Sequence, residues 1–145
     1  THIKDRLAML RMGVTSNPNF EISDLEIQRG GTSYAIDTIR EYKSDQDCDS
    51  RELFYLIGSD SLQTFHTWKE PREILDECQV IVALRPGFLP SDISNWILRK
   101  VRFASIPRFE IGSSTIRSRW RENKTIRYMV TQPVWEYIND HGIYQ

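Results

Sequence analysis

The first quarter of the chain shows two kinds of apolar spacing. Apolar residues recur at helical intervals over Thr1–Val14, which predicts an amphipathic helix. The polar, proline-containing turn Ser16–Asn19 ends that helix. Over Phe20–Ile27 the apolar residues Phe20 and Ile22 alternate with polar neighbours, and this alternation predicts a strand.

A glycine-rich turn at Arg29–Ser33 separates this predicted strand from a second helix. The hydroxyls of that turn are suited to capping a helix that runs to about Tyr42, with Ile36, Ile39 and Tyr42 facing inward. The polar, acidic segment that follows, Lys43–Arg51, is predicted to be a loop.

Three strands are predicted in the middle of the chain. The nearly continuous apolar run in Glu52–Ile57 is typical of a strand buried on both faces, and Gln79–Leu84 and Val101–Ile106 are the other two. Helices are predicted between and after them at Pro71–Glu77, at Asp92–Lys100 and, closed by Gly142, at Val134–His141. This alternation of strand and helix predicts an α/β fold with a mostly parallel sheet and helices on its faces.

Three glycine-marked turns follow the predicted strands. They are Gly58–Ser61, Arg85–Gly87 and Gly112–Thr115. In an open parallel sheet, ligands bind at the carboxyl ends of the strands, so we expect these turns to lie along one edge and to line one cleft.

The segment Glu110–Arg121 is the strongest local candidate for chemistry. Gly112, Ser113, Ser114 and Thr115 are small residues at the expected start of an arginine-rich helix. Small residues leave the first backbone N–H groups of a helix open, and the helix dipole adds positive potential, so the pattern suits a phosphate group. An ordinary serine-capped surface helix explains the same local pattern.

Composition sets the limits on function. The chain has 145 residues, 39% hydrophobic and 27% charged, with a net charge of −1, so any anion site must be local. No apolar run approaches the roughly 18–20 residues that span a bilayer, and no signal peptide opens the chain. Cys48 and Cys78 lie far apart, which favours a reduced, cytoplasmic setting. We find no metal-ligand cluster.

Three single residues remain open to two interpretations each. Asp60 is suited to binding ribose hydroxyls or to capping a helix, and Trp68 to stacking on a planar ring or to anchoring the core. His66 has no partner residue in sequence, which favours a surface role. The basic–aromatic run at 99–103 is compatible with nucleic-acid binding, but its alternation is typical of a strand with one polar face.

An ordered set of motifs over essentially the whole chain resembles the bacterial nicotinate-nucleotide adenylyltransferase family. The motifs are Arg6-x-x-Met9-Leu10, Gly31–Tyr34, Tyr55–Leu62, Phe65–Trp68, Val82–Gly87, Ile111–Arg117 and Pro133–Tyr144. The resemblance implies a Rossmann-like fold with a C-terminal helical region. It also implies adenylyl transfer from ATP to nicotinate mononucleotide in NAD biosynthesis, usually with Mg²⁺ and without a covalent enzyme intermediate.

The resemblance also assigns site residues. ATP phosphates are expected at Gly112, Ser113, Ser114 and Arg117, with Arg117 as the catalytic residue. The adenosine part of ATP is expected at Gly58, Asp60 and Arg85. The substrate pyridine is expected to stack on Trp68, with the backbone around Lys69 and the turn of Ser33, Tyr34 and Ala35 near its carboxylate. No nucleic-acid or membrane partner is implied, no metal ligand is assigned, and homo-oligomer formation is left open.

The chain departs from the family pattern at three places. Gly112 stands where a serine is usual, and Ala35 where a threonine is usual, which weakens one contact to the pyridine side. The family's opening strand and its Gly-Gly-x-Phe-x-Pro-x-His-x-x-His loop are not in this sequence. We therefore expect the chain to be a single domain that lacks a first strand–helix–strand unit, roughly 30 residues or more, and to be inactive alone.

Other function classes fit parts of the pattern. A sister adenylyltransferase acting on phosphopantetheine shares the serine-rich phosphate segment. A non-catalytic nucleotide-binding module that lacks the histidine loop is a further alternative. A nucleic-acid binder would associate with a steep salt dependence.

Overall fold

The computed structural model describes residues 1–85, 88–107 and 111–144. The chain forms two compact units. Unit 1 combines Thr1–Ser23 with Phe109–Gln145, and unit 2 is Asp24–Arg108. The single domain expected from the sequence stays a prediction. No helix among the described residues is long and apolar enough to cross a membrane.

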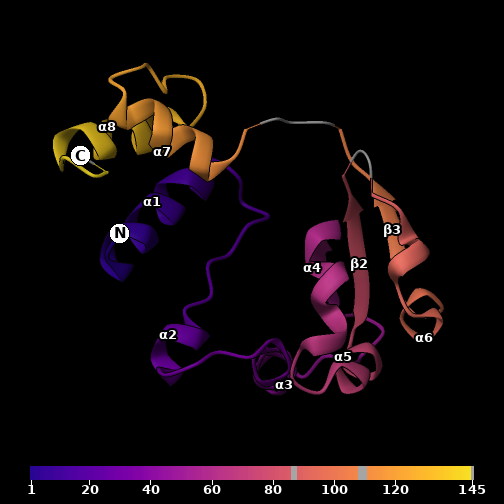
Figure 1. Ribbon diagram of the computed structural model, residues 1–145. Helices are drawn as coiled ribbons and strands as arrows, with labels where there is room; N and C mark the ends of the chain where they lie inside the picture. The colour runs from indigo at the N-terminus through magenta and orange to yellow at the C-terminus, as the bar shows by residue number, and fades with distance from the viewer. Residues whose placement is uncertain (86–87, 108–110, 145) are drawn as a thin grey trace. The chain divides into compact units, whose positions relative to one another are not determined.

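Unit 2 contains a parallel sheet of three strands in the order β1-β2-β3, flanked by helices (Figure 1). Its elements are α2 (Leu25–Arg29), α3 (Ala35–Gln46), β1 (Phe54–Gly58), α4 (Ser59–Thr64), the 3-10 turn η1 (Phe65–Thr67), α5 (Pro71–Glu77), β2 (Gln79–Leu84), η2 (Pro90–Asp92), α6 (Asn95–Leu98) and β3 (Arg102–Ser105). The α/β class and the parallel sheet predicted from the sequence are confirmed.

The core of unit 2 lies where helices pack against the central strand β2. Val80 and Val82 of β2 are buried, as are Leu62 and Phe65 on the connection that follows β1. Cys78, just before β2, belongs to the same core, and burial raises the pKa of its thiol to about 11. A thiol with this pKa stays protonated near neutral pH, so Cys78 acts as a small apolar side chain.

Unit 1 is a helical packing of α1 (Ile3–Val14), α7 (Ser113–Arg121) and α8 (Gln132–Asp140). Its buried residues are Ile126, Ile138 and Ile143. The hydroxyl of Tyr137 in α8 donates to a carboxylate oxygen of Asp5 in α1 at 3.0 Å, which joins the two ends of the chain. The C-terminal helical region expected from the resemblance is present, and Gly142 ends it at a positive φ of 58°.

Two expectations about local structure were wrong in the first half of the chain. The segment predicted as a strand, Phe20–Ile27, is irregular up to Asp24 and then becomes α2. Asp24 and Gly30 flank this helix, and these end signals outweigh the short alternation of apolar residues. Helix α3 runs four residues beyond Tyr42 to Gln46, and Tyr42 is exposed, whereas Ile36 and Ile39 are buried as expected.

Two further expectations were wrong around the sheet. Strand β1 is not buried on both faces, because its alternate residues Phe54 and Leu56, which share one face of the sheet, are exposed. The helix predicted over Asp92–Lys100 is instead η2 followed by the four-residue α6, which begins after Ser94.

Leucine-to-alanine substitutions test where the core lies. Leu62 is fully buried, so Leu62→Ala is expected to lower the free energy of unfolding by about 2–5 kcal/mol through lost burial and the cavity left behind. Leu89 is 72% exposed, so Leu89→Ala is expected to change the free energy of unfolding by about 0.5 kcal/mol or less. Urea unfolding of both variants measures the difference, and equal effects would contradict this placement of the core.

Candidate active site

The carboxyl ends of β1 and β2 bring together three of the predicted site residues. The register pairs Gly58 with Ala83, so the residues after each strand are neighbours. The backbone N–H of Arg85 donates to the buried hydroxyl of Ser59 at 3.3 Å, and the Arg85 guanidinium forms an ion pair with Asp60. Both charged side chains are 66% exposed, so the pair contributes little stability and stays accessible to a ligand.

The structure decides against one interpretation of Asp60. Gly58 is the N-cap of α4, and Asp60 lies in the first turn of that helix without capping it. A carboxylate in the first turn of a helix is favoured by the helix dipole, and it remains available to hydroxyl groups. The other part of the second predicted turn, Pro86 and Gly87, lies outside the described residues.

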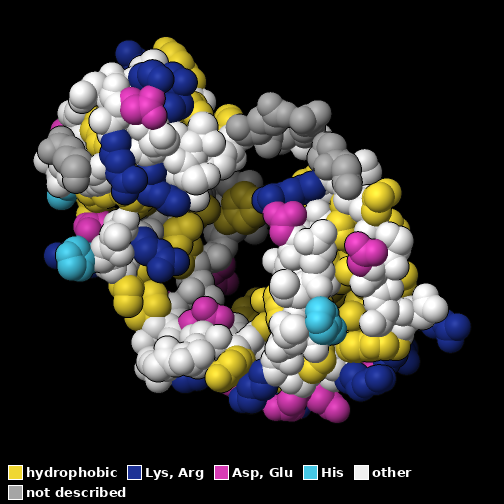
Figure 2. Space-filling view, in the orientation of Figure 1, with side chains coloured by type: hydrophobic (Ala, Val, Ile, Leu, Met, Phe, Trp, Pro, Cys, Tyr) yellow, Lys and Arg dark blue, Asp and Glu magenta, His cyan; other side chains and the backbone are white. Residues whose placement is uncertain are grey.

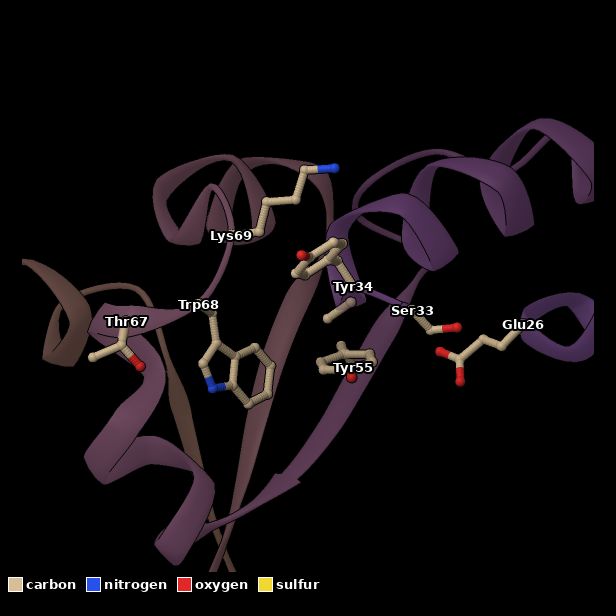
Figure 3. Close-up of a pocket in the computed structure, with 8 residues that line it drawn as sticks. Glu26, Ser33, Tyr34, Tyr55, Thr67, Trp68 and Lys69 are labelled. Atoms are coloured by element: carbon tan, nitrogen blue, oxygen red, sulfur yellow. The ribbon is translucent and has the colours of Figure 1, made fainter. Parts of the chain in front are cut away.

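A cavity of about 370 Å³ within unit 2 is lined by the four residues assigned to the pyridine substrate (Figure 3). Ser33 and Tyr34 form one side of it, immediately before α3, and Trp68 and Lys69 form another, immediately before Glu70, the N-cap of α5. The remaining lining residues are Glu26, Ala35, Tyr55 and Thr67. Segments 35 residues apart in the sequence therefore meet at one pocket.

Trp68 is both a core residue and a pocket residue. It caps the end of η1 in an extended conformation, and its ring is tilted against Phe65 with centroids 5.1 Å apart. The edge-to-face contact with Tyr55 places the two ring centroids 6.4 Å apart. Figure 3 shows the Trp68 and Tyr55 rings side by side in the pocket. Core contacts fix the indole, and its accessible part is free to stack on a planar ligand.

Lys69 links the two sides of the pocket. Its ammonium donates to both carboxylate oxygens of Asp37 in α3 at 2.9 Å, and it lies 4.8 Å from the centre of the Tyr34 ring. The side chains of Lys69 and Asp37 are 40% and 31% exposed. The ion pair and the cation–π contact together hold Tyr34 and Lys69 in fixed positions.

Tyr55 supplies a hydroxyl group to the pocket. Burial raises the pKa of its phenol, and the nearby carboxylate of Glu26 adds to the increase. The raised pKa means that the Tyr55 hydroxyl keeps its proton at neutral pH and is available as a hydrogen-bond donor.

The start of α7 has the form predicted for a phosphate site. Gly112 is the N-cap in an extended conformation, Ser113 opens the helix, and no side chain caps it. Ser113 and Ser114 are exposed, and Arg117 is half-buried one turn further on. The first N–H groups of a helix have no intrahelical partner, so they remain available to an anion here.

A second cavity, of about 610 Å³, lies within unit 1 beside the start of α7. Ser113 and Arg117 line it, together with Arg6 of α1 and Tyr144. Figure 2 shows several Lys and Arg side chains on the visible face of this unit. Two arginines and the open end of a helix give the cavity a local positive potential, although the whole chain carries a net charge of −1.

Sequence reasoning missed several lining residues. Arg6 belonged to a matched motif but received no role, and Glu26 was assigned to a strand. Tyr55 belonged to an apolar strand and to a matched motif but also received no role, although alternation along β1 places it on the opposite face from Leu56. His66 is exposed and does not line the pocket, in line with the surface role predicted for it.

The described residues contain no group of three or more His, Cys, Asp or Glu side chains that could hold a metal ion.

The fold and these sites define a class of protein. Parallel strands with crossover helices, polar turns at the strand ends and an open, arginine-flanked helix start are typical of Rossmann-like enzymes that bind nucleotides. In agreement, residues 1–119 match the family model described as cytidylyltransferase-like.

Bacterial relatives give a narrower placement. "Probable nicotinate-nucleotide adenylyltransferase" of Salinibacter ruber is 36% identical over 143 residues, which cover 99% of this chain and 72% of the relative. The protein of the same name from Thermomicrobium roseum is 38% identical over 155 residues, which cover 100% of this chain and 69% of that relative. "Nicotinate-nucleotide adenylyltransferase" of Bacillus subtilis is 32% identical over 140 residues, covering 97% and 70%.

Solved structures support the fold. The nicotinic acid mononucleotide adenylyltransferase of Plasmodium falciparum complexed with APC superposes with a TM-score of 0.74 at 20% identity, covering 99% of this chain and 76% of that one. The same protein complexed with NaAD gives a TM-score of 0.72 at 21% identity, covering 99% and 75%. The chain belongs to the nicotinate-nucleotide adenylyltransferase family, within the cytidylyltransferase-like group.

Two glycines test the backbone geometry of the site. At Gly112 φ is −118°, and an added Cβ would come no closer than 3.8 Å to another atom, so Gly112→Ser is expected to change the free energy of unfolding by a few tenths of a kcal/mol, roughly. Gly30 has φ +68° and ψ 178°, a conformation that is essentially restricted to glycine. Gly30→Ser is therefore expected to destabilise by about 1–3 kcal/mol. Thermal unfolding compares the two, and the reverse order would contradict the geometry.

Proposed function

We propose that this chain carries the pyridine-binding and phosphate-binding residues of a nicotinate-nucleotide adenylyltransferase. The reaction joins nicotinate mononucleotide to the adenylyl group of ATP and gives nicotinate adenine dinucleotide and pyrophosphate. One observation carries the proposal. Ser33, Tyr34, Trp68 and Lys69, which the family resemblance assigns to one substrate, line one cavity. The names of the relatives and the ligands of the Plasmodium falciparum protein point to the same chemistry.

The mononucleotide binds with its pyridine ring on the accessible part of Trp68. A pyridinium ring is a planar cation, which stacks favourably on an indole. The carboxylate of the ring lies near Lys69 and the Ser33–Ala35 turn, where an ammonium group, a hydroxyl and backbone N–H groups are present. Ala35 offers no hydroxyl, so preference for the acid over the amide rests on the other groups.

The triphosphate of ATP binds at the start of α7, where Gly112, Ser113 and Ser114 present backbone N–H groups and hydroxyls. The adenosine part binds at Gly58 and Asp60, beside Arg85. These assignments are supported by the open helix start and by the Asp60–Arg85 pair at the strand ends. A ribose hydroxyl donates well to a carboxylate such as that of Asp60.

In the reaction, a phosphate oxygen of the mononucleotide forms a bond to the α-phosphorus of ATP. The bond from that phosphorus to the oxygen shared with the β-phosphate breaks, and pyrophosphate leaves. The enzyme holds the reactants in line and stabilises the charge on the phosphate oxygens. Arg117 is the catalytic residue, because a guanidinium pairs with phosphate oxygens in a fixed geometry.

The family resemblance implies Mg²⁺, which would accompany the triphosphate of ATP. Mg²⁺ in nucleotide sites commonly has only one or two carboxylate ligands from the protein. When bound, the ion neutralises charge on the phosphates. Formation of a homo-oligomer stays a prediction to be tested by light scattering.

Trp68 tests the pyridine site. In the full-length protein, Trp68→Ala is expected to weaken nicotinate mononucleotide binding about tenfold or more, since one stacking contact is worth roughly 1–3 kcal/mol, while Trp68→Phe retains most of the affinity. Trp96, whose ring packs on Arg72 outside the pocket, provides the control substitution Trp96→Phe. Calorimetric titration with the acid and amide mononucleotides measures both effects. Tighter binding of the amide form would refute the substrate assignment.

Arg117 tests the phosphate site. Arg117→Ala is expected to lower kcat for pyrophosphate release by about 10²-fold or more, because the charge that stabilises the transition state is lost. Arg121 lies on the same helix and is exposed, so Arg121→Ala is the matched control and should retain activity. Equal losses in both variants would assign the effect to helix charge as a whole and not to Arg117.

A further inference from the structure

The loop that carries Ser33 and Tyr34 into the pocket is short and rich in glycine. It runs from Gly30 to Tyr34, between the end of α2 and the start of α3. Gly30 and Gly31 both have positive φ, at 68° and 66°. Glycines lose more conformational entropy on ordering than other residues, so a loop of this composition needs contacts elsewhere to hold one shape.

Arg29 provides contacts across this loop. It is the last residue of α2, and its Nε donates to Oε2 of Glu41 in α3 at 2.9 Å. The Arg29 Nη2 group donates to the same oxygen. Its Nη1 donates to the hydroxyl of Thr38, also in α3, at 3.3 Å. A residue on one side of the loop is thus bonded to two residues on the other side.

The same network reaches the pocket wall. The Thr38 hydroxyl, which accepts from Arg29, donates to Oε1 of Glu26 at 2.9 Å. Glu26 lines the pocket from α2, and its side chain points toward that of Ser33 (Figure 3). Glu26, Arg29, Thr38 and Glu41 therefore form one chain of hydrogen bonds, which we call the Arg29 network.

The Arg29–Glu41 pair is less exposed to solvent than the Asp60–Arg85 pair at the strand ends. Its side chains are 24% and 36% exposed, compared with 66% for both members of the Asp60–Arg85 pair. Partial burial reduces screening by solvent, and three donor groups of one planar guanidinium fix its orientation. Lysine cannot reproduce this arrangement, because it has a single nitrogen.

We propose that Arg29 is a positioning residue for the pyridine substrate, acting through Glu41 and Thr38 to fix the Gly30–Tyr34 loop. Arg29 itself does not line the pocket. With the network intact, Ser33 and Tyr34 are ordered before the substrate arrives, so binding does not have to order the loop. Without the Arg29 network, ordering the glycine-rich loop on binding would reduce the net binding free energy. This inference rests on the proposed function for the identity of the ligand.

Binding measurements on the full-length protein test the proposal. Arg29→Ala is expected to weaken nicotinate mononucleotide binding on the order of tenfold and to leave ATP binding unchanged, since ordering one backbone residue already corresponds to such a factor. Glu41→Ala should give a similar loss, and the double variant no more than either single one, because both remove one network. Thr38→Val, nearly identical in shape, should weaken binding by less and in the same direction.

The controls separate positioning from general loss of stability. Lys100→Ala removes an exposed ion pair with Asp76 in the same unit and should bind both ligands as the parent protein does. Arg29→Lys keeps the charge and should not restore the affinity. Additive losses in the double variant, or an equal loss of ATP affinity, would overturn the proposal.

Hydrogen exchange tests the loop without any ligand. The amide of Gly30 donates to the carbonyl of Glu26, and the amide of Thr38 donates to the carbonyl of Tyr34, so both report on the ends of the loop. Both should exchange faster in Arg29→Ala than in Lys100→Ala. If the parent protein fails to bind the mononucleotide, the proposed function fails, and unchanged exchange rates would separately refute the role of Arg29.

Discussion

The parallel register of β1 and β2 is the constraint on which the rest of unit 2 depends. Because Gly58 pairs with Ala83, strands β1 and β2 end at the same edge of the sheet, and Ser59 and Asp60 lie beside Arg85. The same strand carries Tyr55, whose ring meets Trp68 on the connection back to β2. A change in register by one residue would send Tyr55 to the opposite face of the sheet.

Two residues proposed to bind the pyridine substrate are held in place by neighbouring residues of this unit. Trp68 is fixed by Phe65, a fully buried core residue, and Lys69 is fixed by Asp37 on the neighbouring helix. Side chains held in this way lose little freedom when a ligand binds, which favours affinity. In unit 1 the groups already held in position are backbone N–H groups, because the helix itself orients those at the open start of α7 and no side chain is needed.

Much of this arrangement was predictable from the sequence, for definite physical reasons. The apolar segment of β2 and the helices α5 and α8, each with a proline in its first turn, have strong local signals, and the structure confirms them. The four pocket residues were assigned by family resemblance, and the fold brings them to one cavity. Their roles in binding stay predictions. Helix α2 was missed because two alternating apolar residues were given more weight than Asp24 and Gly30 at its ends.

The remaining features depend on contacts between distant residues. Arg29 meets Glu41 twelve positions away, and Lys69 meets Asp37 across thirty-two. No local pattern indicates such pairs, because many charged residues of both signs are equally suited in sequence. The exposure of Phe54 and Leu56 was also missed, since an apolar run does not reveal which faces of a strand are covered by other elements.

A crystal structure of the full-length protein with nicotinate mononucleotide would test the central claim most directly. The account predicts electron density for the pyridine ring stacked on Trp68, with its carboxylate beside Lys69 and the Ser33–Ala35 turn. Density for the ring at any other position, with this pocket left to solvent, would contradict it.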